Sequence, residues 1–524
     1  MARVLGYRGR PAEGPVEAFD HDLARHRNVV RAVHERVYFR PLLASLAGAG
    51  SLSAEAASAG LASFGFSDID RTRQAVRELT RGLTRSSRMM QQLLPLVLDW
   101  LSEAPDPDGG LLGLRKLASR DQRTTELAHA FRDSADVARH LCLALGTSSL
   151  FTDWLIVNPD LIDRLADPSR LRTLARDALI ESSGQALAWR RETAERQRAL
   201  HRWRDRHLLG VAARDVFGVA DVDGVGADLT VLAEAVLERT VLELAPEVPF
   251  AVVALGRMAG GELAYASDVD LVFVHEAAAA PERAEAMRLA VGVLRFVGGT
   301  TGAQRIYRVD TNLRPEGRDG PLTRSLDGYS AYFARWADVW ERQAMARARP
   351  VAGDPELGRR FAEVVEEAVW GRPFTDDHAR EVRRLKARIE RERIPAGEDP
   401  EFHLKLGKGA MADVEWTAQL IQLRTGVRAP GTIAALAALE AEGALTAGDA
   451  EVLAAAYRFC ELARNRWYLV GAGPAGVDAL PAQPAPLDRL ARSMGTTRVG
   501  LRADYRRVTR RARRVVERLF YAAT

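Results

Sequence analysis

The chain has 524 residues, of which 47% are hydrophobic and 27% are charged, and its formal net charge is +4 at pH 7. This length and composition are those of a globular protein with about three domains and an ample core. The sequence has no charged-then-apolar leader and no apolar run of about 20 residues, which argues against secretion and against a membrane span.

The net charge and the cysteine and histidine residues argue against several further classes of binding site. The net charge is modest, and no stretch interleaves aromatic with basic residues, so a nucleic-acid partner is not indicated. Cys142 and Cys460 lie far apart in apolar stretches. They are interpreted as buried thiols in a reducing cytoplasm, and not as metal ligands or a disulfide. The ten histidines form no cluster with metal-ligand spacing, so zinc is not indicated.

The first part of the chain, residues 1 to about 190, is rich in Ala, Leu and Arg with apolar residues at helical spacing, which predicts stacked helices. Breaks are expected in the glycine- and proline-containing stretches 47–50 and 104–110. The clearest helices, including two that follow this region, are predicted at 20–37, 76–83, 124–145, 189–209 and 229–243.

The middle of the chain, residues 248–351, alternates strand, loop and helix patterns, and the rest is again helical. Loops rich in proline and glycine interrupt that last region near 394–400 and 473–486. We therefore expect an α+β protein with a mixed sheet and helical flanks. The expected domains are residues 1–190, 191–352 and 353–524.

The strongest chemical signal is a pair of acids that follows a glycine-rich turn. The apolar run 250–255 leads into the turn with Gly260 and Gly261, and Asp268 and Asp270 stand at the start of the next apolar run. Side chains alternate along a strand, so the two carboxylates would project together while Val269 faces the core. Adjacent carboxylates suit hard divalent cations, and glycines allow a backbone to approach a phosphate closely.

A third acid strengthens this interpretation. The segment 304–310 alternates in polarity, is predicted to be a strand, and ends in Asp310. A neighbouring strand could bring Asp310 beside Asp268 and Asp270, and three carboxylates around two metals are typical of phosphoryl-transfer sites. By itself, Asp310 could equally cap a strand or pair with Arg308 or Arg314.

The residues around this site are similar to a known family. The segment 256–271, GRMAGGELAYASDVDL, resembles the nucleotidyltransferase motif of glutamine synthetase adenylyltransferase/adenylyl-removing enzymes, members of the DNA polymerase beta-like superfamily. Ala259 and Ala410 stand where glycine is usual. Further blocks agree in family order: RVDTNLRPEG at 308–317, WERQA at 340–344, ARARPVAGD at 346–354 and LKLGKGAMADVEW at 404–416.

The resemblance implies a fold and a chemistry. It implies a polymerase beta-like core in which Asp268, Asp270 and Asp310 are catalytic and hold Mg²⁺, with ATP as the substrate. Complete family members resemble two catalytic halves in tandem, whereas this chain has a single Ser-Asp-x-Asp site. The block at 34–43 resembles the segment after the first half, which places this chain as the C-terminal half.

Further residues are candidates for binding the nucleotide. Lys405 and Lys408 flank a glycine in a loop before a helix, where they could hold a triphosphate or could form a solvated turn. Arg347 and Arg349 would lie on one side of an extended segment, where phosphate contacts and salt bridges with Glu341 or Asp354 are equal alternatives. Ser267 could cap the glycine turn.

Two other pairs of residues lie near these candidates in the sequence. Asp413 and Glu415 are two residues apart on a predicted helix, so at most one can point at the site. Trp336 and Trp340 are four apart and are assigned to the core in preference to a base-stacking platform.

By resemblance, the chain would move AMP from ATP to a tyrosine hydroxyl of glutamine synthetase. One alternative is the opposite reaction, phosphorolytic removal of AMP, which uses the same carboxylates. Another is a non-catalytic half that binds glutamine synthetase or a PII signalling protein. No membrane partner is expected, and the expected location is cytoplasmic.

Overall fold

The computed structural model describes residues 26, 54–80, 85–119, 123–167, 170–171, 175–392, 394–395, 397–471, 473 and 476–521. The expected helix at 20–37, apart from residue 26, the break at 47–50 and the block at 34–43 lie outside these residues. The chain divides into two compact units, residues 1–166 and 167–524, and each is described by itself.

The first unit is helical where it is described, as expected. Its helices are α3 (Ala54–Ser63), α4 (Ile69–Thr80), α5 (Arg85–Glu103), α6 (Pro107–Ala118), α7 (Arg123–Asp133), α8 (Ala135–Thr147) and α9 (Ser149–Val157). The single helix expected at 124–145 is wrong, because Ser134 starts a new helix by accepting a hydrogen bond from the Val137 N–H. The break expected at 104–110 is too long, since Asp106 caps α6 and Pro107 occupies its first turn.

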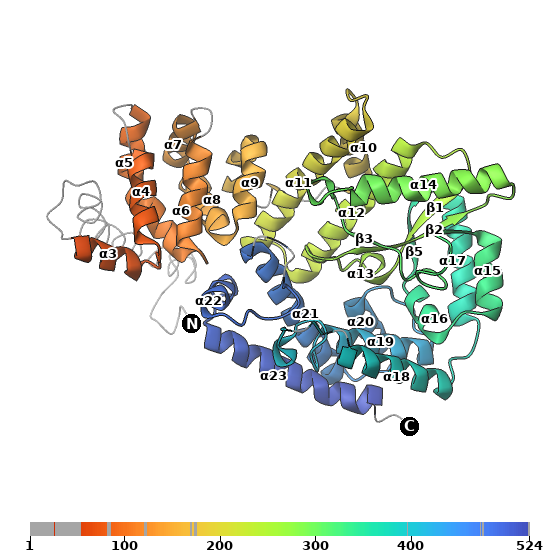
Figure 1. The fold of residues 1–524 in the computed structure, drawn as a ribbon. Coiled ribbons are helices and arrows are strands. Elements are labelled where there is room, and N and C mark those ends of the chain that lie inside the picture. The colour runs from red at the N-terminus through yellow and green to blue at the C-terminus, as the bar shows by residue number, and fades with distance from the viewer. Residues whose placement is uncertain are drawn as a thin grey trace, which may run out of the picture. The chain divides into compact units, whose positions relative to one another are not determined.

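The second unit contains a five-stranded mixed sheet (Figure 1). Its strands are β1 (Phe250–Ala254), β2 (Val269–His275), β3 (Val309–Asp310), β4 (Thr323–Ser325) and β5 (Arg349–Gly353). The order is β3-β2-β1-β5, and β4 also pairs with β2. Strand β1 runs antiparallel to β2 and β5, whereas β3 and β4 run parallel to β2. The expected strand at 304–310 is reduced to its last two residues, because residues 302–304 form a 3₁₀ turn.

Helices cover both faces of this sheet, which makes an α+β core with helical flanks as expected. Alternate residues of β1 and β2, such as Val253 and Val272, pack with the side chains of α15 (Leu326–Arg335) and α17 (Pro355–Trp370). Phe250 and Phe273 point to the other face and stack with their ring centroids 5.8 Å apart. Helix α12 (Val222–Leu244) packs on β5 and on α14 (Ala280–Gly298).

Among the described residues of the second unit, three α-helices precede the sheet. The predicted helices at 189–209 and 229–243 correspond to α11 (Thr193–Val216) and α12, and α10 (Arg176–Leu187) comes before them. Trp189 lies in the turn between α10 and α11 and is 92% exposed. The expected domain boundary at residue 190 therefore falls in this turn, inside the second unit.

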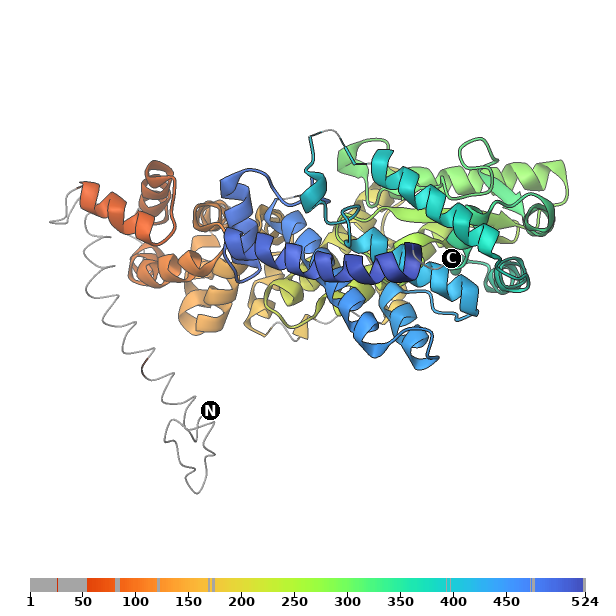
Figure 2. The ribbon, with the colours of Figure 1, turned by 90° about the horizontal axis from the view of Figure 1, so that it is seen from below.

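The C-terminal part of the second unit is a helical bundle with its own core, formed by residues such as Leu453, Leu490 and Tyr505. Its members are α18 (Asp376–Glu392), α19 (Met411–Thr425), α20 (Thr432–Ala441), α21 (Ala447–Val470), α22 (Pro484–Ser493) and α23 (Arg498–Val516). Helix α23 lies against α19, α21 and α22, and Figure 2 shows it in dark blue along the bundle. A short helix, α16 (Val339–Met345), lies between α15 and β5 in the chain.

Two further features of the structure concern the cysteines and the apolar character of the helices. Cys142 and Cys460 are buried free thiols, as predicted. Among the helices that the structure describes, none has the length and apolar character needed to cross a bilayer.

Candidate active site

The acidic residues of the site are placed by the register of β2 and β3. These strands pair in parallel with Val269 opposite Val309 and Asp270 opposite Asp310. Val269 is fully buried, so the alternation of side chains turns Asp270 to the other face, as predicted. Neighbouring strands are about 5 Å apart, so the register brings Asp270 and Asp310 together.

The electrostatics of Asp270 reflect this crowding. Burial raises the pKa of its carboxyl to about 7, and the negative charges of Asp310 and Asp268 add to that effect. Lys405, which comes from a loop of the C-terminal bundle, lowers the same pKa. Asp310 accepts a hydrogen bond of 2.7 Å from the N–H of Asn312. A carboxylate that is strained by a neighbour of like charge favours a cation at the same place.

Asp268 is arranged differently from the other two acids. Its side chain is 43% exposed, and its Oδ1 lies 2.5 Å from Nε of Arg308. Arg308 therefore pairs with Asp268. The alternative interpretation, in which Arg308 would pair with Asp310, is not what the structure shows. In the described part of the chain, no group of three or more ligating side chains is close enough to hold a metal ion. The site thus has a converging pair, Asp270 and Asp310, with Asp268 beside it in an ion pair.

This donor set nevertheless fits a divalent cation. Asp270 and Asp310 offer hard oxygen atoms on one half-buried surface, and their mutual repulsion raises the pKa of Asp270. Magnesium is usually held by one or two carboxylates, while waters and substrate phosphates complete its octahedron. A complete cage of protein ligands is therefore not required.

The glycine that matters for the acids is Gly256. It adopts φ +55°, and a Cβ there would lie 2.4 Å from Oδ2 of Asp270. Gly260 and Gly261 were predicted to approach a phosphate, but they lie in a second, smaller pocket beside Gly431. A Cβ on Gly260 would be 3.0 Å from the carbonyl oxygen of Pro430, so this glycine serves the contact between core and bundle.

A large cleft opens in front of the acids, with a volume of about 1060 Å³. One wall is the sheet and its loops, with Gly256, Ser267, Asp268, Asp270 and Asp310. The other wall comes from α16 and the C-terminal bundle. Its residues include Trp340, Gln343, Arg347, Glu398, Lys405, Trp416, Gln419, Arg464, Val477 and Asp478.

The predicted cations divide between this cleft and other places. Lys405 and Arg347 line the cleft, and Arg347 donates a hydrogen bond of 2.8 Å to Oγ1 of Thr432. Arg349 instead donates to Oε1 of Glu234 at 2.5 Å and to the carbonyl of Ala259 at 3.1 Å. The salt-bridge alternative therefore holds for Arg349, with a partner that the sequence did not indicate.

The positions of Lys408 and of the start of α19 also do not fit the phosphate-binding role that the sequence suggested for them. Lys408 is exposed and is not among the described residues that line the cleft. The N–H of Gly409 donates to Oδ2 of Asp413 at 2.6 Å, and Asp413 also pairs with Lys386 at 2.6 Å. The helix N-terminus is thus already occupied by a buried carboxylate.

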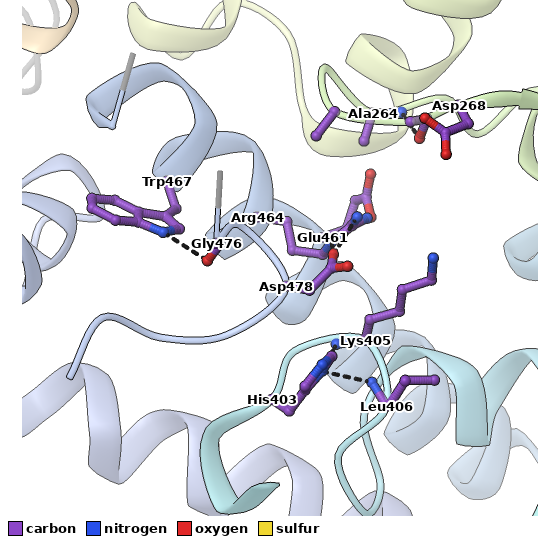
Figure 3. A network of polar contacts seen from close by, with 12 residues as sticks. Ala264, Asp268, His403, Lys405, Leu406, Glu461, Arg464, Trp467, Gly476 and Asp478 are labelled. Atoms are coloured by element: carbon purple, nitrogen blue, oxygen red, sulfur yellow. Dashed lines mark hydrogen bonds and ion pairs between the residues drawn. The ribbon is translucent and has the colours of Figure 1, made fainter. Parts of the chain in front are cut away.

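His403 shapes the loop that presents Lys405. Its Nδ1 accepts hydrogen bonds from the N–H groups of Lys405 at 3.2 Å and Leu406 at 3.0 Å, as Figure 3 shows. Burial lowers the pKa of His403, which keeps this ring neutral and able to accept. In the same view, the Lys405 side chain extends toward Asp268 on the opposite wall.

Ser267 and the two tryptophans can also be placed. Oγ of Ser267 accepts from the N–H of Ala264 at 3.0 Å, so it braces the turn before the acids, and it also lines the cleft. Trp336 was expected in the core but is 72% exposed, because it lies just past the end of α15. Trp340 is half-buried and lines the cleft instead.

Comparisons with known proteins show which family and which relatives the chain is similar to. Residues 138–364 match the model of the glutamate-ammonia ligase adenylyltransferase family, and residues 379–523 match that of the GlnD PII-uridylyltransferases. The chain is similar to proteins named bifunctional glutamine synthetase adenylyltransferase/adenylyl-removing enzyme. It is 37% identical to that of Streptomyces avermitilis, over 100% of this chain and 56% of that protein. It is 39% identical to that of Mycolicibacterium smegmatis, over 95% and 53%.

The chain belongs to the glutamate-ammonia ligase adenylyltransferase family. It spans about half the length of the curated relatives that it matches.

Several residues of this adenylyltransferase-family cleft were not found from the sequence. Arg464 and Asp478 line the cleft from the bundle, and on the same wall Gln343 of α16 donates to Gln419 of α19 at 2.7 Å. Of Asp413 and Glu415, it is Glu415 that approaches the site: its Oε1 lies 3.6 Å from Nη1 of Arg257, and Arg257 lines the cleft. Arginines are frequent throughout this sequence, so no local pattern distinguishes Arg464 from the rest.

Proposed function

We propose that this chain transfers AMP from ATP to a tyrosine hydroxyl of glutamine synthetase. The observation that carries the proposal is the paired Asp270 and Asp310 beside a large cleft, in a member of this family. In the reaction, the bond from the α-phosphorus to the pyrophosphate oxygen breaks and a bond to the tyrosine oxygen forms. The phenol proton passes to solvent, and pyrophosphate leaves.

A divalent cation goes with this proposal. Bound Mg²⁺ would neutralise phosphate charge and lower the pKa of the attacking hydroxyl. Asp270 and Asp310 would hold it in the positions they already occupy. Asp268 would contribute by giving up its ion pair with Arg308. The catalytic roles of all three acids are therefore part of the proposal.

The other predicted residues receive roles that follow their places. Lys405 and Arg347 would contact phosphates, because both line the cleft. Ser267 would hold the turn under the acids. We assign no nucleotide contact to Gly260, Gly261, Arg349 or Lys408, which lie elsewhere. Catalysis would then need both the region 191–352 and the bundle of region 353–524.

The direction of the reaction rests on the resemblance. We propose that this region corresponds to the C-terminal, transferring half of the family, with AMP removal by phosphate as the second candidate. The relatives' name, which includes both activities, favours keeping that candidate. A PII signalling protein is proposed as a regulatory partner, and the cytoplasm as the compartment, in keeping with two free buried cysteines.

One experiment separates these candidates. The chain is incubated with glutamine synthetase, Mg²⁺ and ATP labelled in the α-phosphate, and in parallel with AMP-modified synthetase and phosphate. Label on the synthetase supports transfer, and phosphate-dependent release of ADP supports removal. No reaction in either arm, with tight binding to the synthetase, would leave a binding half in place of an enzyme. A salt-sensitive affinity for single-stranded nucleic acid would point to a different nucleotidyltransferase class.

A further inference from the structure

The bundle wall of the cleft carries two cations, Lys405 and Arg464. Lys405 is exposed, and within the part of the chain that the structure describes its Nζ has no hydrogen-bond or salt-bridge partner. Arg464 of α21 is 5% exposed and also lines the cleft. In Figure 3, Lys405 lies beside Asp478 and points upward toward Asp268, and Arg464 is next to Asp478.

The guanidinium of Arg464 is paired with Asp478 along one edge, and on another edge its Nη1 faces Glu461 without a hydrogen bond. Its Nε and Nη2 lie 2.8 Å and 2.6 Å from Oδ1 of Asp478. Its Nη1 is buried and makes no hydrogen bond to any described residue, although it lies 3.5 Å from Oε2 of Glu461. A buried cationic donor without a hydrogen bond is costly unless a ligand supplies an acceptor.

Glu461 ties this arginine to the catalytic core. Its Oε1 accepts from Nη2 of Arg257 at 2.6 Å, while its Oε2 faces Arg464. Arg257 follows Gly256, the residue that lies against Asp270. A chain of charged contacts therefore runs from Arg257, the neighbour of Gly256, through Glu461 to the Nη1 donor of Arg464.

We propose that Arg464, together with Lys405, binds the pyrophosphate end of the nucleotide across the cleft from Asp270 and Asp310. Arginine matches the geometry of phosphate oxygens, and its fixed plane reduces the entropy lost on binding. Asp478 and Glu461 act as positioning residues that hold the guanidinium. During AMP transfer, these cations would stabilise the negative charge that collects on the leaving pyrophosphate. This inference rests on the proposed function.

Binding of inorganic pyrophosphate and of ATP to the full chain, by calorimetry with and without MgCl₂, tests the inference without glutamine synthetase. The variant is Arg464→Gln, and the matched control is Arg458→Gln, which removes an exposed arginine of the same helix that pairs with Asp223. Loss of one charge-assisted hydrogen bond should raise the Kd for pyrophosphate by about tenfold in Arg464→Gln. Arg458→Gln should match the unmodified chain.

Because Arg464→Gln leaves Asp478 without its partner, the double variant Arg464→Gln/Asp478→Asn is measured beside it. The double variant removes the ion pair as a unit and should show the same loss of pyrophosphate binding. Asp478→Asn alone should weaken pyrophosphate about threefold, and Arg464→Lys should recover part of the affinity. Unchanged pyrophosphate binding in a folded double variant would overturn the role of Arg464.

The same data separate this inference from the function beneath it. Loss of pyrophosphate binding in Arg464→Gln, in a chain that never labels glutamine synthetase, would support the subsite and refute AMP transfer. Normal labelling with unchanged KM for ATP in Arg464→Gln would refute the subsite and leave AMP transfer intact.

Discussion

The two walls of the cleft are built on different physical principles. The sheet wall places Asp270 and Asp310 through backbone register, in which β2 and β3 pair residue by residue. The bundle wall places Lys405 and Arg464 through side-chain contacts, with His403 under the loop and Asp478 against the guanidinium. A register held by backbone pairing is little affected by substitutions on the surface. An ion-pair network depends on each of its members, so the loss of one side chain alters the positions of the others. We therefore expect chemistry to depend on the first wall and nucleotide affinity on the second.

Among substitutions in the sheet wall, Asp270→Asn should reduce activity the most. We expect the rate of AMP transfer to fall by about 10⁴-fold, because the central oxygen donor of the cation site is lost. Radioactive AMP incorporated into glutamine synthetase provides the measurement, and circular dichroism controls for folding. A variant with near-normal activity in Mg²⁺ would remove Asp270 from the site.

Replacement of Asp310 should divide kcat from KM. In Asp310→Ala, Asp270 can still hold one cation with the triphosphate, so we expect kcat to fall by about 10³-fold with KM for ATP within about threefold. Steady-state kinetics over a range of ATP concentrations measures both constants. The opposite pattern, a large rise in KM with kcat intact, would move Asp310 to the nucleotide-binding wall.

A methyl group at Gly256 should disturb the acids without removing one. Its Cβ would lie 2.4 Å from Oδ2 of Asp270, and its φ is +55°. Displacement of the carboxylate should reduce kcat by about 10²-fold. Gly261→Ala is the matched control, since Gly261 has φ +74° but open space around its Cβ position. Equal losses in the two variants would mean that backbone strain, and not the contact with Asp270, is responsible.

The two loop lysines test the bundle wall. We expect Lys405→Met to raise KM for ATP by about tenfold with a smaller effect on kcat, because a cation near the phosphates is lost. Lys408→Met serves as the control, since this exposed residue lies outside the cleft lining that the structure describes. A larger effect from Lys408 would restore the phosphate role first expected for it.

The smallest effect concerns stability without metal. The pKa of Asp270 is raised to about 7 from its usual value of 3.8. Between these values the folded state keeps a proton that the unfolded state has released, so stability falls as pH rises through this window. When the pH is raised from 5 to 8 in EDTA, the melting temperature should therefore fall more for the unmodified chain than for Asp270→Asn. An equal fall in both proteins would show that Asp270 does not titrate in this range.

The sequence allowed the sheet wall to be predicted because its information is local. Alternation along a strand places Val269 and Asp270 on opposite faces, and a second strand ending in Asp310 needs only to lie alongside. The bundle wall depends on tertiary contacts. Which of Lys405 and Lys408 enters the cleft depends on hydrogen bonds that His403 and Asp413 accept from backbone N–H groups, and no spacing rule contains these.

The glycines show the same limit in another form. Gly256, Gly260 and Gly261 stand in one motif, yet only the structure shows that Gly256 lies against Asp270 and Gly260 against the bundle. Similarly, Arg349 was correctly considered for a salt bridge, but Glu234 comes from α12, far away in the chain. Local patterns indicate which residue types are present, and packing decides which of them meet.

The link from Arg257 through Glu461 to Arg464 has a consequence for how the protein is made. A ribosome releases the acids of β2 long before it releases helix α21, so a nascent chain carries the acidic half of the cleft alone. Contacts between residues so far apart in sequence form late in folding, since a long loop must close first. Under the proposed roles, ATP would be bound productively only after the bundle has docked, which ties the onset of activity to completed synthesis of residues 397–521.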